Sequence, residues 1–146
     1  MAKLLILYDS QTSNTEKMAQ AVAEGARSVS GVDVELKYYA EPKELAEADA
    51  IAFGAPTYHH EITLPLKQIL EETAKAGAKL EGKIGAAFGS YGWSGEAPDK
   101  VLEIMKNRFE MKTIEPPIKV LYEPKQQQLE ECQKLGKRIA QELSGK

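Results

Sequence analysis

The sequence predicts an α/β fold in which a parallel sheet of five strands is covered by helices on both faces. Short runs of apolar, β-branched or small residues alternate with longer segments that carry apolar residues at helical spacing, and this alternation is typical of parallel sheets. The first, third and fourth runs are apolar almost throughout, as strands buried on both faces must be. The expected strands are residues 2–8, 32–38, 50–54, 84–88 and 118–122.

The second expected strand alternates apolar and charged side chains from Val32 to Lys37, as an edge strand does. The first helix follows from a stripe that contains Met18 and Val22. A short helix is expected over residues 41–48, and the third helix has Thr63 as a candidate N-cap, with Pro65 in its first turn. The last two helices follow from the stripes Val101, Leu102, Met105, Phe109 and Leu129, Cys132, Leu135, Ile139, Leu143.

Length and composition narrow the class of protein. A chain of 146 residues can bury a real core, and we expect one domain over residues 1–146. The net charge of −3 argues against nucleic acid and anionic membranes as partners. No apolar stretch approaches the roughly 20 residues of a membrane span, and the chain enters a strand without a signal peptide. Cys132 is the sole cysteine, so no internal disulfide or cysteine cluster is expected. These points favour a cytoplasmic location.

A loop rich in hydroxyl groups follows the first strand, and it contains no lysine or arginine. The first turn of the next helix presents N–H groups without partners and the positive end of a dipole, and both bind anions. The sequence therefore indicates a phosphate cradle. The same residues also fit a polar turn in which Thr12 or Ser13 caps the helix and Glu16 completes a capping box.

Two further loops combine aromatic and small residues. Gly54-Ala-Pro-Thr-Tyr-His-His60 follows the third strand, and Phe88-Gly-Ser-Tyr-Gly-Trp-Ser-Gly95 follows the fourth. Ligands of such sheets bind at the carboxyl ends of the strands. Tyr58 on one side, and Tyr91 or Trp93 on the other, could take the two faces of a planar ring. Alternatively, the glycines only form a turn and Trp93 packs on the surface.

The three loops together resemble those of the flavodoxin family. The amino-acid sequences of the second and third loops are most similar to the flavodoxin domain of A-type flavoproteins (flavodiiron proteins). The resemblance covers the whole chain. It implies a flavodoxin-like three-layer sandwich with strand order 2-1-3-4-5 and a non-covalently bound FMN. Carried over by position, the phosphate would be held by Ser10, Gln11, Thr12, Ser13, Asn14 and Thr15. The isoalloxazine would be held by Pro56, Thr57, Tyr58, His59, His60, Gly89, Ser90, Tyr91, Gly92, Trp93 and Gly95.

The sequence departs from the family pattern at two places. The phosphate loop usually has glycine where Ser13 stands, so Ser13 must adopt a compatible backbone or the loop is reshaped. Residues 55–61 contain no glycine, whereas many flavodoxins have one whose peptide accepts a hydrogen bond from the N5–H of the one-electron-reduced flavin. A β-carbon at His59 makes positive φ costly. We expect that reduced form to be less stabilised here, which a redox titration tests.

The resemblance implies an electron carrier in which FMN performs the redox chemistry. We therefore expect no catalytic residue, and we expect redox proteins, such as ferredoxin-like donors and oxidoreductases, as partners at the flavin edge. An alternative is an FMN-dependent NAD(P)H or quinone reductase, and another is a detached module that serves a separate diiron partner. The diiron ligand set is absent from this sequence. We expect a monomer or a weak dimer.

The histidines and acidic residues near the predicted site need no metal or catalytic role. A metal site at His59, His60 and Glu61 is not expected, because adjacent side chains in a loop rarely converge on one ion. One of these histidines could instead lie near the flavin and respond to its charge, or both could be solvated. Acidic residues near the predicted mouth would lower the flavin potential, or they are ordinary surface charges; they are Asp9, Glu61, Glu96 and Asp99.

Overall fold

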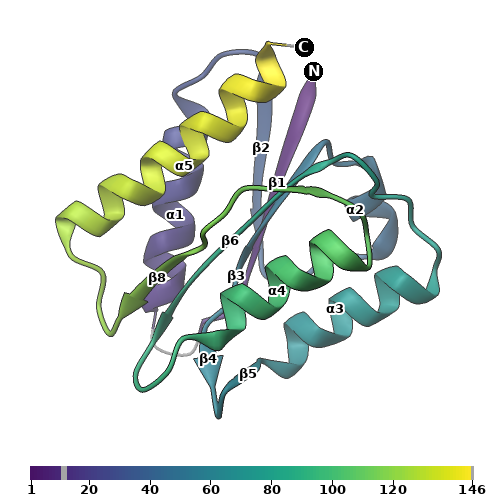
Figure 1. Cartoon of the computed structure of the whole chain (residues 1–146). Helices are drawn as coiled ribbons and strands as arrows, with labels where there is room; N and C mark the ends of the chain where they lie inside the picture. Colours follow the sequence, from purple (N-terminus) through teal and green to yellow (C-terminus); the bar gives the residue numbers. More distant parts are fainter. Residues whose placement is uncertain (11–12, 146) are drawn as a thin grey trace.

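The computed structural model describes residues 1–10 and 13–145, and it contains one mostly parallel sheet between two layers of helices (Figure 1). The five main strands pair in parallel in the order β2-β1-β3-β6-β8. In chain order this is 2-1-3-4-5, so the predicted topology is confirmed. These strands are β1 (Ala2–Tyr8), β2 (Val32–Lys37), β3 (Ala50–Gly54), β6 (Ile84–Tyr91) and β8 (Ile118–Leu121).

Within the described residues the sheet has eight strands, so the predicted number of five is too small. Three additional strands of two residues each are β4 (Thr57–Tyr58), β5 (Glu61–Ile62) and β7 (Lys112–Thr113). Two residues give no readable alternation of apolar and polar side chains, so the sequence pattern does not reveal them. β4 and β5 form an antiparallel hairpin, and β4 also pairs with the end of β6.

The ends of two main strands differ from the prediction because of their neighbours. β6 continues three residues beyond Phe88, to Tyr91, because its pairing with β8 extends as far as Tyr91 opposite Leu121. β8 ends at Leu121, since Tyr122 has a φ of 60° and leaves the extended conformation.

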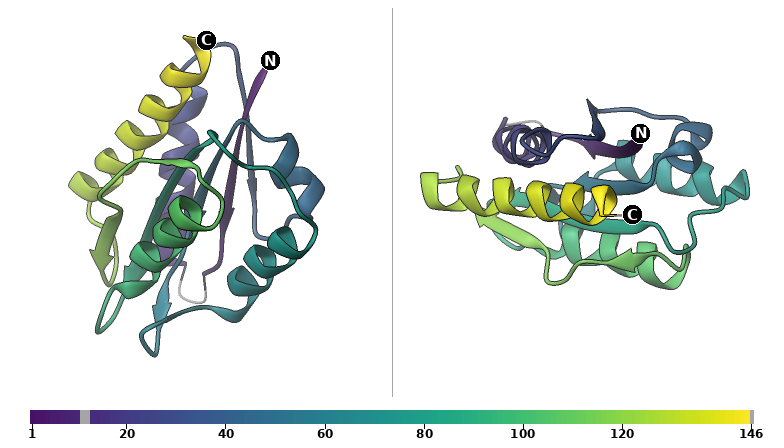
Figure 2. Two further views of the ribbon diagram at one scale, coloured as in Figure 1. Left: turned by 45° about the vertical axis from the view of Figure 1, so that its right-hand side comes forward. Right: turned by 90° about the horizontal axis from the view of Figure 1, so that it is seen from above.

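In the part of the chain that the structure describes, two helices cover one face of the sheet and three cover the other (Figure 2). Side chains of β1 alternate between the two cores: Leu4 and Ile6 pack toward α1 and α5, whereas Leu5 and Leu7 pack toward the other three helices. The helices are α1 (Asn14–Arg27), α2 (Pro42–Glu47), α3 (Leu64–Lys75), α4 (Glu96–Asn107) and α5 (Gln126–Ser144). Each lies where the sequence places a helix, but α4 ends at Asn107, so Phe109 of the predicted stripe is buried beyond the end of the helix.

Helices α1 and α5 approach each other closely at two glycines. A β-carbon on Gly25 would lie 1.9 Å from the carbonyl oxygen of Gln133, and one on Gly136 would lie 1.9 Å from the carbonyl oxygen of Val22. Only glycine permits such an approach. The tight pair buries Cys132, as its place on the apolar stripe predicts.

The carboxyl ends of the main parallel strands lie at one edge of the sheet, the lower edge in Figure 1. The loops that carry the predicted site all leave from this edge, which is where doubly wound sheets bind ligands. Across the described residues, no helix combines the length and apolarity that crossing a membrane requires.

Candidate functional site

A pocket of about 380 Å³ lies at the carboxyl edge of the sheet, between the loops that follow β1, β3, β6 and β8. Most of the residues predicted from the sequence line it. They are Asn14, Thr15, Pro56, Thr57, Tyr58, His59, His60, Ser90, Tyr91, Gly92 and Trp93. Gln11 and Thr12, which were also predicted, lie outside the described residues.

Ser13 occupies the N-cap position of α1 with a φ of 70°. This is the left-handed backbone that glycine adopts most easily, so Ser13 takes a conformation compatible with the glycine of the family pattern. The N–H groups of the first helical turn have no partner inside the helix. They carry the positive end of the dipole of α1 toward the loop, as a site for phosphate needs.

The capping box does not form with Ser13 as the cap, and the alternative with Thr12 lies outside the described residues. The side chain of Ser13 makes no capping hydrogen bond. The backbone N–H of Glu16 instead donates to the hydroxyl of Ser10, 3.3 Å away. The carboxylate of Glu16 accepts a bond of 3.1 Å from the hydroxyl of Tyr8. Burial, followed by this bond to Glu16, raises the pKa of Tyr8.

Two buried threonine hydroxyls are oriented by backbone donors. Thr15 Oγ1 accepts a hydrogen bond of 3.2 Å from the N–H of Ser90. Thr57 Oγ1 accepts one of 2.9 Å from the N–H of Ala97. Because each oxygen already accepts a bond from a backbone N–H, its own hydrogen is available for donation to a ligand. Both residues line the pocket.

Gly89 and Gly95 do not line the pocket, and the structure gives both a role in packing. A β-carbon on Gly89 would lie 2.1 Å from the carbonyl oxygen of Ala55, because β6 and the loop after β3 touch at this point. Gly95 is the N-cap of α4, and a β-carbon there would lie 3.0 Å from the ring of Tyr91. Both glycines therefore allow close packing beside residues of the pocket loops.

Aromatic rings from three loops surround the opening of the pocket. Tyr58 and Tyr91 are half-buried, whereas Trp93 is 86% exposed and Tyr122 is 63% exposed. Tyr122 was not among the predicted site residues. It is the last residue of the predicted strand 118–122, so the rule that ligands bind at the carboxyl ends of strands could have identified it. Its carbonyl accepts a 2.6 Å bond from the hydroxyl of Ser90.

The β4–β5 hairpin turns at His59 and His60, which have φ values of 52° and 65°. A turn with positive φ at both central residues suits a two-residue hairpin, although Asn-Gly is its usual sequence. The positive φ that we considered costly at His59 is therefore present. Whether the one-electron-reduced flavin is less stabilised here stays a prediction.

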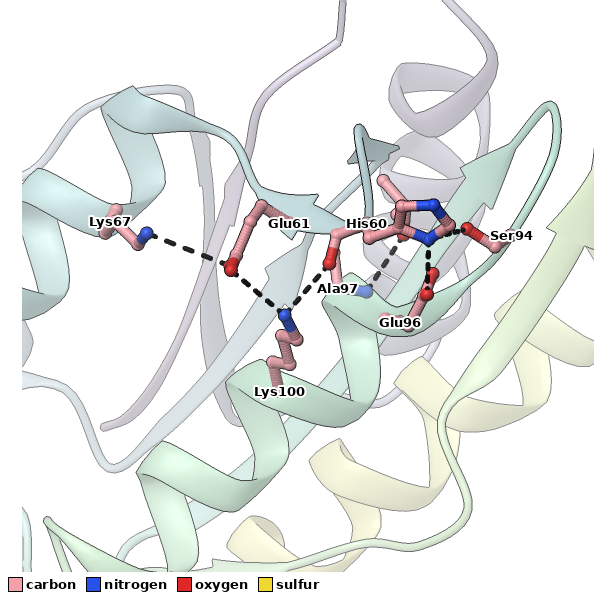
Figure 3. A network of polar contacts seen from close by, with 8 residues as sticks. His60, Glu61, Lys67, Ser94, Glu96, Ala97 and Lys100 are labelled. Carbon is pink, nitrogen blue, oxygen red and sulfur yellow. Dashed lines mark hydrogen bonds and ion pairs between the residues drawn. The ribbon is translucent and has the colours of Figure 1, made fainter.

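The imidazole of His60 is held by the residues at the start of α4 (Figure 3). Its Nδ1 lies 2.7 Å from Glu96 Oε2 and 2.8 Å from Ser94 Oγ. Hydrogen bonds with Ser94 and then with His60 lower the pKa of Glu96 to about 2. Ser94 also lines the pocket. Like Tyr122, it was not named among the predicted site residues.

Three of the four acidic residues expected near the mouth have partners of opposite or titratable charge. Glu61 pairs with Lys100 at 3.1 Å, and Asp99 pairs with Lys119 at 2.7 Å. Glu96 lies against His60. The lysine partners offset the negative charges of Glu61 and Asp99, so we expect a smaller lowering of the flavin potential than four unpaired acids would give.

Comparisons with known proteins identify the family. The family model described as flavodoxin matches residues 6–136. The chain belongs to the flavodoxin family.

Individual relatives divide into two kinds. A solved flavodoxin from the domain Archaea superposes with a TM-score of 0.89 at 40% identity, and the match covers 97% of this chain and 99% of the other. The type A flavoprotein fprA of Rhodobacter capsulatus is 37% identical over 98% of this chain, but over only 34% of its own length. The flavodiiron core of Flv1 from Synechocystis has a TM-score of 0.85 at 29% identity, over 99% of this chain and 36% of the other. The chain thus spans about one third of the length of the first curated relatives that it matches.

FMN is the cofactor of the flavodoxin family, and the residues of this site fit it. The left-handed backbone at Ser13 and the first turn of α1 form a cradle for a phosphate without a cationic side chain. The oriented hydroxyl of Thr15 can donate a further bond. Tyr58, Tyr91 and Trp93 supply aromatic surface for a planar ring system. The resemblance drawn from the sequence is confirmed at the level of family and cofactor.

Proposed function

We propose that this chain transfers electrons between redox proteins by means of FMN bound at the carboxyl edge of its sheet. The observation that carries the proposal is the convergence of three features on one pocket: the cradle at α1, the oriented hydroxyls of Thr15 and Thr57, and the aromatic residues of the later loops. FMN supplies the redox chemistry when it is bound. The chain binds it, orients it and sets the charge around it.

Partners would meet the flavin at the exposed side of the pocket. Trp93 and Tyr122 are large, exposed side chains there, and aromatic residues are enriched in protein interfaces. Encounters between redox proteins use small, transient interfaces, which fits a monomer or weak dimer. We further propose that residues 1–146 act as a single domain and that the protein is cytoplasmic, because the chain is acidic and has a single, buried cysteine.

The test is stepwise anaerobic reduction of the purified protein, followed by its visible spectrum, with the released cofactor identified. We expect FMN, reduced through one-electron states and reoxidised by a redox protein acceptor. Steady-state oxidation of NAD(P)H by the same preparation should be negligible. Rapid NAD(P)H oxidation with reduction only in a two-electron step would favour the reductase alternative instead. Absence of flavin, even after incubation with FMN, would contradict the proposal.

A second candidate function is that of a flavodoxin module that serves a separate diiron protein. It is favoured by the match of nearly this whole chain to one third of a type A flavoprotein. The two candidates share the cofactor but differ in the acceptor. Reduced protein should pass electrons quickly to a separately purified diiron domain in the second case, and the two should elute together in size-exclusion chromatography.

A further inference from the structure

The turn of the β4–β5 hairpin is held in an unfavourable backbone conformation. His59 and His60 both have positive φ, and each has a β-carbon that makes this region costly. The hairpin itself is short, since its strands pair only at Thr57 with Ile62 and at Tyr58 with Glu61. Two-stranded hairpins of this size are marginally stable. Contacts from elsewhere must therefore determine the conformation of the turn.

Those contacts come from α4 and from Trp93 and Ser94, which lie shortly before it. Lys100 Nζ donates a hydrogen bond of 2.9 Å to the backbone carbonyl of His60. The His60 ring lies against Glu96 Oε2 and Ser94 Oγ, and its centroid is 5.4 Å from that of Trp93. Figure 3 shows Ser94, just before α4, and Glu96 and Lys100 of α4 reaching the turn. We call Ser94, Glu96 and Lys100 the hairpin clamp.

Lys100 also restrains the residue that follows the turn. Its ammonium lies 3.1 Å from the carboxylate of Glu61, which Lys67 of α3 approaches to 3.8 Å. The hydrogen bond with Lys100 is the main cause that lowers the pKa of Glu61. One lysine side chain therefore binds both the backbone of the turn and the strand that leaves it.

We propose that Lys100 and Glu96 are positioning residues for the flavin, which fix the strained His59-His60 turn so that the pocket wall is formed before FMN enters. Tyr58, His59 and His60 belong to that wall. A wall that is already ordered does not lose conformational entropy on binding, so the affinity is higher. The inference rests on FMN binding, which is part of the proposed function.

The decisive experiment is a double-mutant cycle on FMN affinity, measured by the quenching of flavin fluorescence when apoprotein is titrated. In the natural chain, Lys100→Met should weaken binding about tenfold, because a charged hydrogen bond to the turn is lost. In a background carrying His59→Asn and His60→Gly, the same change should alter affinity less than about twofold. Asn-Gly favours positive φ at both central residues of a two-residue hairpin, so the turn is then ordered without the clamp.

The Asn-Gly background separates positioning from simple electrostatic attraction. The carbonyl of residue 60 remains for Lys100 in that background, and so does the positive charge. If Lys100 only attracts the anionic cofactor, its replacement will weaken binding equally in both backgrounds, and that result would overturn the inference. Lys106→Met is a matched control on the same helix, paired with Glu115 at 3.5 Å, and it should leave affinity unchanged.

Hydrogen exchange of the apoprotein gives a readout that does not depend on flavin. Amides of residues 57–62 should exchange faster in Lys100→Met and in Glu96→Gln than in the natural chain, while amides of β1 and β3 keep their protection. Unchanged exchange at the hairpin in both variants would overturn the inference. Circular dichroism verifies that each variant is folded. Failure of the natural chain to bind FMN would refute the proposed function. If the chain binds FMN but Lys100→Met does not change the affinity, only the inference about the clamp is refuted.

Discussion

The hydroxyl of Thr57 accepts a hydrogen bond from the backbone N–H of Ala97, which lies 40 residues later in the chain and 2.9 Å away. Ala97 is in the first turn of α4 and is fully buried, so its N–H has no access to water. Thr57 thus satisfies a helix terminus from a different loop. It joins the two segments that flank the predicted ring site.

Replacement of Thr57 by valine should destabilise the protein, because it leaves the N–H of Ala97 buried without an acceptor. We expect the free energy of unfolding to fall by about 1–3 kcal/mol in urea denaturation of the apoprotein. Thr57→Ser should retain most of the stability, since it keeps the oxygen. Thr113→Val removes a hydroxyl bound to Glu115 at an exposed site, and it should cost less than about 0.5 kcal/mol. Equal losses for Thr57→Val and Thr113→Val would contradict this role of Thr57.

Gly89→Ala should be strongly destabilising, although Gly89 does not line the pocket. Its new methyl group would lie 2.1 Å from the carbonyl oxygen of Ala55, and a backbone atom cannot move aside as a flexible side chain can. We expect a loss of about 2 kcal/mol or more in the free energy of unfolding. Gly92→Ala is the control, because its β-carbon would lie 3.4 Å from the Tyr122 ring, an ordinary contact. If thermal denaturation shows equal stability for the two variants, the close approach of Gly89 and Ala55 is not rigid.

The contribution of Glu96 to stability should depend on pH. Its folded pKa of about 2 lies below the ordinary value of 4.5, so its stabilising effect is complete above about pH 4.5 and is lost as the pH falls through about 2. The melting temperature of Glu96→Gln apoprotein should therefore lie below that of the natural chain at about pH 6, and the difference should narrow at about pH 3. A difference that stays constant over this range would show that the charge of Glu96 does not matter.

Cys132 should resist alkylation in the native protein. Burial raises the pKa of its thiol to about 12, and the thiolate is the form that reacts. Mass spectrometry after exposure to iodoacetamide at about pH 8 should detect little modified native protein and complete modification in urea. Rapid stoichiometric modification without denaturant would mean that α1 and α5 separate readily.

The phosphate loop shows where prediction from sequence is strong and where it fails. Hydroxyl residues after a buried strand predict the site because helix termini and strand ends create it locally. The same residues do not determine which group each hydroxyl binds. Ser10 and Thr15 bond to backbone N–H groups of Glu16 and Ser90, and the second of these depends on how β6 packs beside α1.

The sequence by itself determined how strands and helices follow one another along the chain, the edge that carries the site and the family to which the chain belongs. The succession of elements follows from apolar periodicity, and the family follows from three loops that resemble its motifs and imply its strand order. Only the tertiary structure decided that Gly89 serves packing, that Tyr122 reaches the pocket and that Lys100 holds the turn at His60. Each of these joins segments 30 or more residues apart, such as the pair Ser90 and Tyr122, separated by 32 positions. Contacts between distant segments depend on how strands and helices pack, and local sequence patterns do not predict that packing.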